Sequence, residues 1–188
     1  MAKRVVVKPG YIYEVQINDR EKCYFQNLGK DTNFFSFGSN AVRVFKKKYP
    51  LDIQIPVDEI VSDDVLFYTH IFIGIGVRHG FYNYVGKSSQ MDIEDLYRVE
   101  FYNLGKEMIN KDGSILEEWS TYHFGDDDLV MKIASPKEGD KYVEIGGVLG
   151  PPHFVNRLKN DGRWGYDPFK FDIDLTKEIH SVIKPLEE

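Results

Sequence analysis

Residues 65–86 read VLFYTHIFIGIGVRHGFYNYVG, and no other stretch of the chain is so apolar for so long. In an extended strand, successive side chains point to opposite faces, and both sets are mostly apolar or aromatic here. β-Branched and aromatic residues dominate the stretch, which favours a strand over a helix. The pattern predicts a central strand from Val65 that is covered on both sides, a turn at residues 78–80 and a second strand from Phe81. We expect these two strands to pair as a hairpin.

Before this stretch, short alternating segments are separated by polar turns. They predict four strands, at residues 11–17, 22–28, 33–37 and 41–45. Short strands with tight turns are typical of a small antiparallel curled sheet or half-barrel. Neither a linker nor an internal repeat interrupts the chain, and 188 residues are a normal length for one domain. We therefore expect a single domain with a β-rich part at about 8–86 and an α+β part at about 87–188.

Helical patterns are concentrated in the second part of the chain. Short helices are predicted at residues 57–61, at 89–98 with Ser89 as its cap, and at 153–159 behind a pair of prolines. Near the C-terminus, apolar residues recur at helical spacing after Asp174, which predicts an amphipathic helix that docks on the sheet; they are Leu175, Ile179, Val182, Ile183 and Leu186. Strands first and helices late indicate an α+β fold with two or three short helices.

The charge balance excludes some classes of partner. With 24 Lys and Arg against 30 Asp and Glu, the net charge is -6. Phosphate contacts need a basic surface, so neither a nucleic acid nor a membrane is an expected partner. The one basic cluster, Lys46–Lys48, is more typical of solvated protection at a strand end. A single cysteine and an N-terminal apolar run of only three residues predict a cytoplasmic protein.

Motifs for catalysis or cofactor binding are incomplete. Gly86-Lys87-Ser88 lacks the first glycine of a phosphate-binding loop, and the glycines at 74 and 76 lack the third glycine of a dinucleotide fingerprint. Cys23 lies within a predicted strand, where it is expected to be a small buried hydrophobe. The histidines show no metal-ligand spacing, and His70 is expected in the core. We therefore predict no cofactor, no metal and no catalytic residue.

Several patterns together carry a resemblance to a known family. They are Pro9-Gly10-x-x-Tyr13, Val42-Arg43-Val44-Phe45, and Phe67-Tyr68-x-His70 followed by Gly76-x-x-x-Gly80. In these the chain resembles the immunity protein 26 family. Residues 143–148 and Tyr166-Asp167-Pro168 are similar to the C-terminal part of longer members, so the resemblance covers about 8–86 and 142–168. It implies an intracellular antidote of a bacterial polymorphic-toxin system that binds and blocks a toxin domain and carries no catalytic residues.

An acidic antidote suits a toxin with a basic active surface, because opposite charges speed and orient their encounter. Acidic clusters and aromatic side chains that we expect to be exposed are the candidates for the contact surface. The predicted partner-binding residues are Asp126, Asp127, Asp128, Asp63, Asp64, Tyr82, Tyr84 and Trp164.

Two other classes of function stay open at this point. The first is a small-molecule-handling enzyme or ligand-binding domain that uses His70, His79 or His123 in an aromatic pocket. It requires two titratable groups that converge in a concave site. His123 beside Asp126–Asp128 also forms a metal-like cluster, although a solvated acidic loop is the preferred interpretation. The second is a nucleic-acid module built on Lys46–Lys48 and neighbouring aromatic residues.

Overall fold

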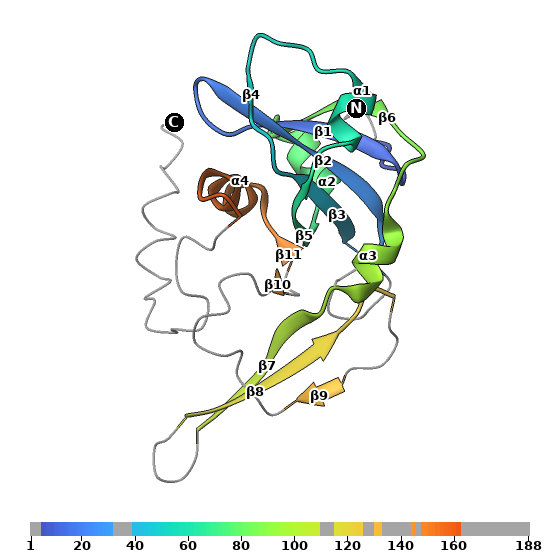
Figure 1. The fold of residues 1–188 in the computed structure, drawn as a ribbon. Helices are drawn as coiled ribbons and strands as arrows, with labels where there is room; N and C mark the ends of the chain where they lie inside the picture. The colour runs from blue at the N-terminus through green and yellow to red at the C-terminus, as the bar shows by residue number, and fades with distance from the viewer. Residues whose placement is uncertain are drawn as a thin grey trace, which may run out of the picture.

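The computed structural model describes residues 5–31, 39–109, 115–125, 130–132, 144–145 and 148–162. The fold is α+β, with a seven-stranded sheet, a four-stranded sheet and, in these ranges, four short helices (Figure 1). The seven-stranded sheet is mixed but mostly antiparallel, and it is neither closed nor strongly curled. The expected half-barrel is therefore wrong. Different strands occupy the two ends of the sheet and do not pair with each other, so the sheet stays open.

The main sheet orders its strands β11-β5-β3-β2-β1-β6, and the short β4 pairs with β2 beside this path. Its strands are β1 (Tyr11–Gln16), β2 (Glu21–Lys30), β3 (Asn40–Phe45), β4 (Tyr49–Pro50), β5 (Val65–Ile71), β6 (Tyr82–Lys87) and β11 (Val148–Leu149). Only β11 runs parallel to its neighbour. The strands predicted at 11–17, 22–28 and 41–45 are confirmed, and residues 33–37 lie outside the described ranges.

The smaller sheet is built on a long hairpin. Its order is β10-β7-β8-β9, with strands β7 (Phe101–Ile109), β8 (Ile115–Tyr122), β9 (Val130–Lys132) and β10 (Glu144–Ile145). The base of the hairpin packs on the main sheet, where Phe101 and Tyr122 lie against His70 of β5. The other end of the hairpin projects away from the rest of the molecule (Figure 1).

The apolar stretch from Val65 gives a strand with both faces covered, as predicted. Phe67 and Ile71 belong to one apolar cluster, and Tyr68 belongs to another. The strand ends at Ile71, however, and residues 73–78 form helix α2 (Ile73–Arg78) rather than more strand. The helix carries the chain back over the sheet, where a Cβ atom at Gly76 would collide with the ring of Tyr82.

The expected hairpin between β5 and β6 is also wrong. Both sides of β5 are already occupied, by β3 along its length and by β11 at its end. After α2 the chain has crossed the sheet, and β6 pairs with β1 at the far edge. The two strands of the most apolar stretch therefore belong to one sheet but do not touch as a pair.

Helices α2 and α4 (Pro151–Lys159) cover one face of the main sheet, here called the first face. Phe154 and Leu158 of α4 belong there to one apolar cluster with residues of six strands, among them Phe25 and Phe67. The opposite, second face is covered by α1 (Val57–Val61), α3 (Ile93–Arg98) and the base of the β7–β8 hairpin.

Helix positions agree with the sequence only in part. Helix α1 lies at the predicted residues, and α4 begins two residues earlier than expected, at the Pro151-Pro152 pair. Helix α3 begins at Ile93, and neither Ser89 nor any other side chain caps it. The predicted C-terminal amphipathic helix lies outside the described residues. None of the helices in the described ranges is long and apolar enough to cross a membrane.

Candidate functional site

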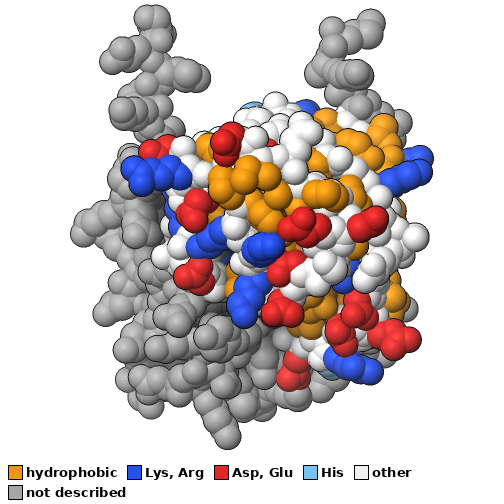
Figure 2. All heavy atoms as spheres, turned by 45° about the horizontal axis from the view of Figure 1, so that its top comes forward, with side chains coloured by type: hydrophobic (Ala, Val, Ile, Leu, Met, Phe, Trp, Pro, Cys, Tyr) orange, Lys and Arg blue, Asp and Glu red, His pale blue; other side chains and the backbone are white. Residues whose placement is uncertain are grey.

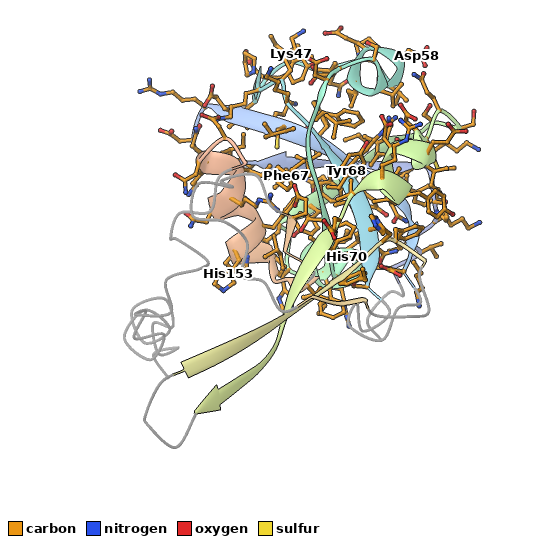
Figure 3. All side chains as sticks on the ribbon, turned by 60° about the horizontal axis from the view of Figure 1, so that its bottom comes forward. Lys47, Asp58, Phe67, Tyr68, His70 and His153 are labelled. Atoms are coloured by element: carbon orange, nitrogen blue, oxygen red, sulfur yellow. The ribbon has the colours of Figure 1, made fainter. Side chains whose placement is uncertain are left out.

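A groove of about 760 Å³ hollows the second face of the main sheet. On one side of it lies the apolar cluster around Phe45 and Ile60, and on the other the cluster around Tyr68 and Leu96. The end of α1, the start of β5 and the segment through α3 line the groove. In Figure 3 the β5 residues Phe67 and Tyr68 lie near the centre of the view, below Asp58 of α1.

Acidic side chains predominate in the lining of this groove. Its charged residues are Asp63, Asp92, Asp95, Glu100 and Glu144 on the acidic side, and Arg43 and Arg98 on the basic side. Figure 2 shows the face near α1, where acidic and basic side chains lie side by side around a band of apolar ones. Among the described residues that line the groove, five are acidic and two are basic.

Arg43 of β3 lies within the groove lining although its side chain is almost completely buried, at 3% exposure. Its Nε donates to Gln26 Oε1 at 2.8 Å, and its Nη2 donates to the Gln90 carbonyl at 2.8 Å. The guanidinium also lies over the ring of Phe45, 5.1 Å from the centroid. Burial lowers the pKa of Arg43, and Tyr68 and Asp92 oppose this effect.

Arg43 has no ion pair in the described part of the chain, although the charge of Asp92 acts on it from a longer distance. No Asp or Glu described there lies within 4 Å of its guanidinium, and Nη1 is the nitrogen that neither Gln26 nor Gln90 engages. A buried charge is costly unless it is paired and hydrogen-bonded. Arg43 therefore places a fixed cation, whose Nη1 neither glutamine engages, at a groove in which acids outnumber bases.

The acids of the groove differ in how far they are engaged. Asp95 pairs with Arg98 at 3.2 Å on the exposed side of α3. Asp63 accepts the backbone N–H groups of Lys47 at 2.7 Å and of Asp64 at 2.8 Å. Asp92 is exposed and has no ion pair or hydrogen bond within the described ranges. Asp92 is thus an exposed carboxylate without an ion pair in the described ranges, and its charge acts on the nearby Arg43.

Glu144 of β10 also reaches the groove, but its charge is already paired. Its two oxygens accept from Arg157 of α4 at 2.9 and 3.1 Å, and the Arg157 guanidinium lies 3.8 Å from the centroid of the Phe67 ring. Burial raises the pKa of Glu144, and the contacts with Arg157 and with the backbone of Tyr68 oppose this rise. This bidentate pair ties α4 to the edge of β5 and closes the groove at that side.

His70 is a core histidine, as predicted. Both His70 and Asp31 are fully buried, with 2.8 Å between Nε2 of the ring and Oδ2 of the carboxylate. The ring packs against Phe101, 4.6 Å away between centroids. Because solvent reaches neither group, this pair is inaccessible to a substrate in the structure.

The other histidines described do not converge with His70. His79 is exposed at the end of α2, and Nδ1 of His123 lies 2.9 Å from the Val99 carbonyl. His153 lies on the outer side of α4, away from His70 (Figure 3). Within the described ranges no group of three or more His, Cys, Asp or Glu side chains could hold a metal ion. Cys23 is buried, which confirms its prediction, and burial raises the pKa of its thiol.

The residues predicted to contact a partner fall in different places. Asp63 lies at the groove and Asp64 beside it. Tyr82 is 1% exposed and packs against Phe25 and Phe154, so the expectation that it is exposed is wrong. It lies on the first face because α2 folds over it. Residues Asp126, Asp127, Asp128 and Trp164 lie outside the described ranges.

Tyr84 is exposed, at 51%, but it does not share a surface with the groove. Its ring contacts Tyr11 and Tyr13, which line the first face. Asp63, by contrast, follows α1 on the second face. Sequence reasoning did not single out Arg43, although an arginine between Val42 and Val44 in an apolar strand was a signal that could have been used.

Comparison with known proteins adds no assignment. No protein-family model matches the chain, and neither the curated proteins nor the solved structures contain a significant match to it.

Proposed function

We propose that this protein is an antidote that binds a basic toxin domain in the cytoplasm and neutralises it by covering its active surface. The observation that carries the proposal is the acidic groove, which five carboxylates and two guanidinium groups line among the described residues. The sequence patterns similar to the immunity protein 26 family support the same function independently of the groove.

Electrostatics explains how such a groove would serve an antidote. Toxin domains that act on nucleic acids need a basic surface to hold phosphate groups. An acidic groove on the antidote raises the rate of encounter with that surface and orients the two molecules. Apolar clusters on both sides of the groove supply area that can be buried once the charges have aligned.

The alternative of an enzyme that uses histidines gains no support from the described residues. It needs two titratable groups that converge in an accessible pocket. His70 does lie beside Asp31, but both are fully buried, and His79 and His123 lie on separate elements. The described residues that line the groove include no histidine.

The experiment that tests the proposal begins with affinity capture of partners from a lysate of the native host by the tagged full chain. The captured partner is then expressed alone and together with this chain, and growth is measured. We expect a stoichiometric partner that stops growth when expressed alone and is tolerated when the chain is present. A partner that is harmless, or toxicity that persists in the presence of the chain, would refute the antidote function.

Charge reversal then locates the contact surface. We compare Asp63→Lys/Asp92→Lys in the groove with reversal of Asp126, Asp127 and Asp128, and we measure association rates with the captured partner at low salt. Slower association of the groove variant is expected, because steering depends on the acids that face the partner. An unchanged rate for the groove variant and a reduced rate for the other would place the contact on residues 126–128 instead.

A further inference from the structure

The groove combines two opposite chemistries. Its rim carries Asp63, Asp92 and the Asp95–Arg98 pair, whereas Arg43 supplies a buried cation whose Nη1 is engaged by neither Gln26 nor Gln90. A ligand that is basic throughout would satisfy the rim but leave Arg43 facing like charge. A ligand that is acidic throughout would satisfy Arg43 but be repelled by the rim. Only a ligand that carries both charges is complementary to all of these groups.

Arg43 is held in a fixed position, which suits the selective binding of one anionic group better than a non-specific attraction of anions. Two hydrogen bonds, to Gln26 and to the Gln90 carbonyl, fix the guanidinium, and the ring of Phe45 lies beneath it. Gln26 is itself buried, and its Nε2 donates to the Ser88 carbonyl at 3.3 Å. A guanidinium that is already ordered loses little entropy when it binds an anion, so it discriminates well between acceptors.

We propose that the groove binds a segment of the partner protein in which one carboxylate is flanked by lysine or arginine side chains. The carboxylate pairs with Arg43 Nη1, and the flanking cations pair with Asp92 and Asp63. This inference deepens the proposed function and rests on it for the identity of the partner, whereas the charge pattern of the segment follows from the groove alone. Charge-assisted hydrogen bonds to a guanidinium are among the stronger polar contacts in interfaces.

The charge pattern can be tested before the partner is known. A library of random peptides displayed on phage is selected on the full folded chain, in parallel with Arg43→Gln and Asp63→Asn/Asp92→Asn. We expect the unmodified chain to enrich peptides with one Asp or Glu between basic residues. Arg43→Gln should keep the basic positions and lose the acidic one, and the double variant should do the reverse.

Because Arg43 is buried, each variant is first checked for folding by thermal unfolding, and Arg43→Lys is selected alongside. The lysine keeps the charge but not the fixed geometry, so enriched peptides should bind it about tenfold more weakly and still prefer the acidic position. His153→Ala, on the exposed side of α4 over the first face, is the matched control and should enrich the same peptides as the unmodified chain. An unmodified chain that enriches no acidic position, or a folded Arg43→Gln variant that enriches the same motif, overturns the inference.

The growth assay separates failure of this inference from failure of the proposed function. If a folded Arg43→Gln variant protects cells as well as the unmodified chain does, the groove inference falls and the antidote function stands. If the unmodified chain does not prevent the toxicity of the partner but still enriches the mixed-charge motif, the antidote function is refuted and the inference about the groove is supported.

Discussion

The two faces of the main sheet are built from the same strands but differ in character. On the first face, one apolar cluster runs without interruption from Tyr13 of β1 to Ile71 of β5. On the second face, two separate clusters lie under α1 and near α3, with the polar pair Gln26 and Arg43 between them. Side-chain alternation allows one sheet to present a continuous core on one side and a charged groove on the other.

The first face is packed as one continuous core, whereas the second face leaves polar side chains at a groove. Phe154 of α4 makes edge-to-face contacts with Phe25, Phe67 and Tyr82, at centroid distances of 5.3, 6.3 and 5.6 Å, which is a favourable range for aromatic rings. On the second face no helix of the described ranges fills the space between the two clusters, and the groove lies there.

The largest expected effect is that of Phe154→Ala. The side chain is fully buried at the centre of the first face, so its removal leaves a cavity that rigid aromatic neighbours cannot fill. We expect the free energy of unfolding to fall by about 3–5 kcal/mol, measured by urea titration. His153→Ala on the exposed side of the same helix should change it by less than about 0.5 kcal/mol. A small loss for Phe154→Ala would mean that α4 is not a principal part of the core.

Arg43→Met is expected to have a smaller effect, because Arg43 has no ion pair in the described ranges and only a longer-range attraction to Asp92 is lost. The variant leaves the buried Gln26 Oε1 without the Arg43 N–H that donates to it, so we expect a loss of about 1–3 kcal/mol in urea unfolding. Adding Gln26→Leu replaces both polar partners with apolar ones and should recover most of this loss. A double variant as unstable as the single one would show that the polar pair contributes to the stability of the sheet.

The difference between the faces also explains what the sequence could predict. The alternation of apolar and polar residues identifies β1, β2 and β3, and this pattern can be read from the sequence alone. In β5 both sets of alternate side chains are apolar or aromatic, which predicts a strand that is covered on both sides. The turn of the chain at Phe72 could not be predicted, because residues 73–78 are apolar enough for either a strand or a helix. Their helical state follows from the close contact of Gly76 with Tyr82, which no local pattern shows.

The same limit applies to the site. Acidic residues at 63 and 64 could be singled out as surface charges, but the groove exists only because α1 and α3 pack on one face at a distance from each other. The sequence could not show that Tyr82 is buried and Tyr84 exposed, because residues two apart on one strand point to the same face. The structure separates them because α2 and α4 cover one and leave the other at the edge.

Tyr13→Phe should change how the free energy of unfolding depends on pH. The buried Tyr13 hydroxyl has no hydrogen-bond partner among the described residues, so its removal should be neutral or stabilise the protein by up to about 1 kcal/mol near pH 7. Burial, with smaller effects of Tyr11 and Tyr84, raises the pKa of Tyr13 to about 12. The unfolded chain loses this proton near pH 10, so the stability that depends on it is complete below pH 10 and is lost as pH rises towards 12.

The measurement for Tyr13→Phe is the free energy of unfolding as a function of pH between neutral and strongly alkaline solution. The decline above pH 10 should be shallower in the variant than in the unmodified chain. It should not vanish, because burial also raises the pKa of Tyr82. An equally steep decline in both proteins would show that Tyr13 keeps its ordinary acidity in the fold.

The smallest expected effect is that of Tyr84→Ser, at the point where the first face meets solvent. Half of the Tyr84 side chain is exposed, and its closest ring contact is with the partly buried Tyr11 at 4.8 Å between centroids. We expect the free energy of unfolding to change by no more than about 0.5 kcal/mol, since only an edge contact is lost. Tyr82→Ser, two residues earlier on the same strand, removes a fully buried ring and should cost several times more, about 3–5 kcal/mol. Equal losses for these two variants would mean that β6 is covered along its whole length, and the contrast between a sealed first face and an open second face would fail.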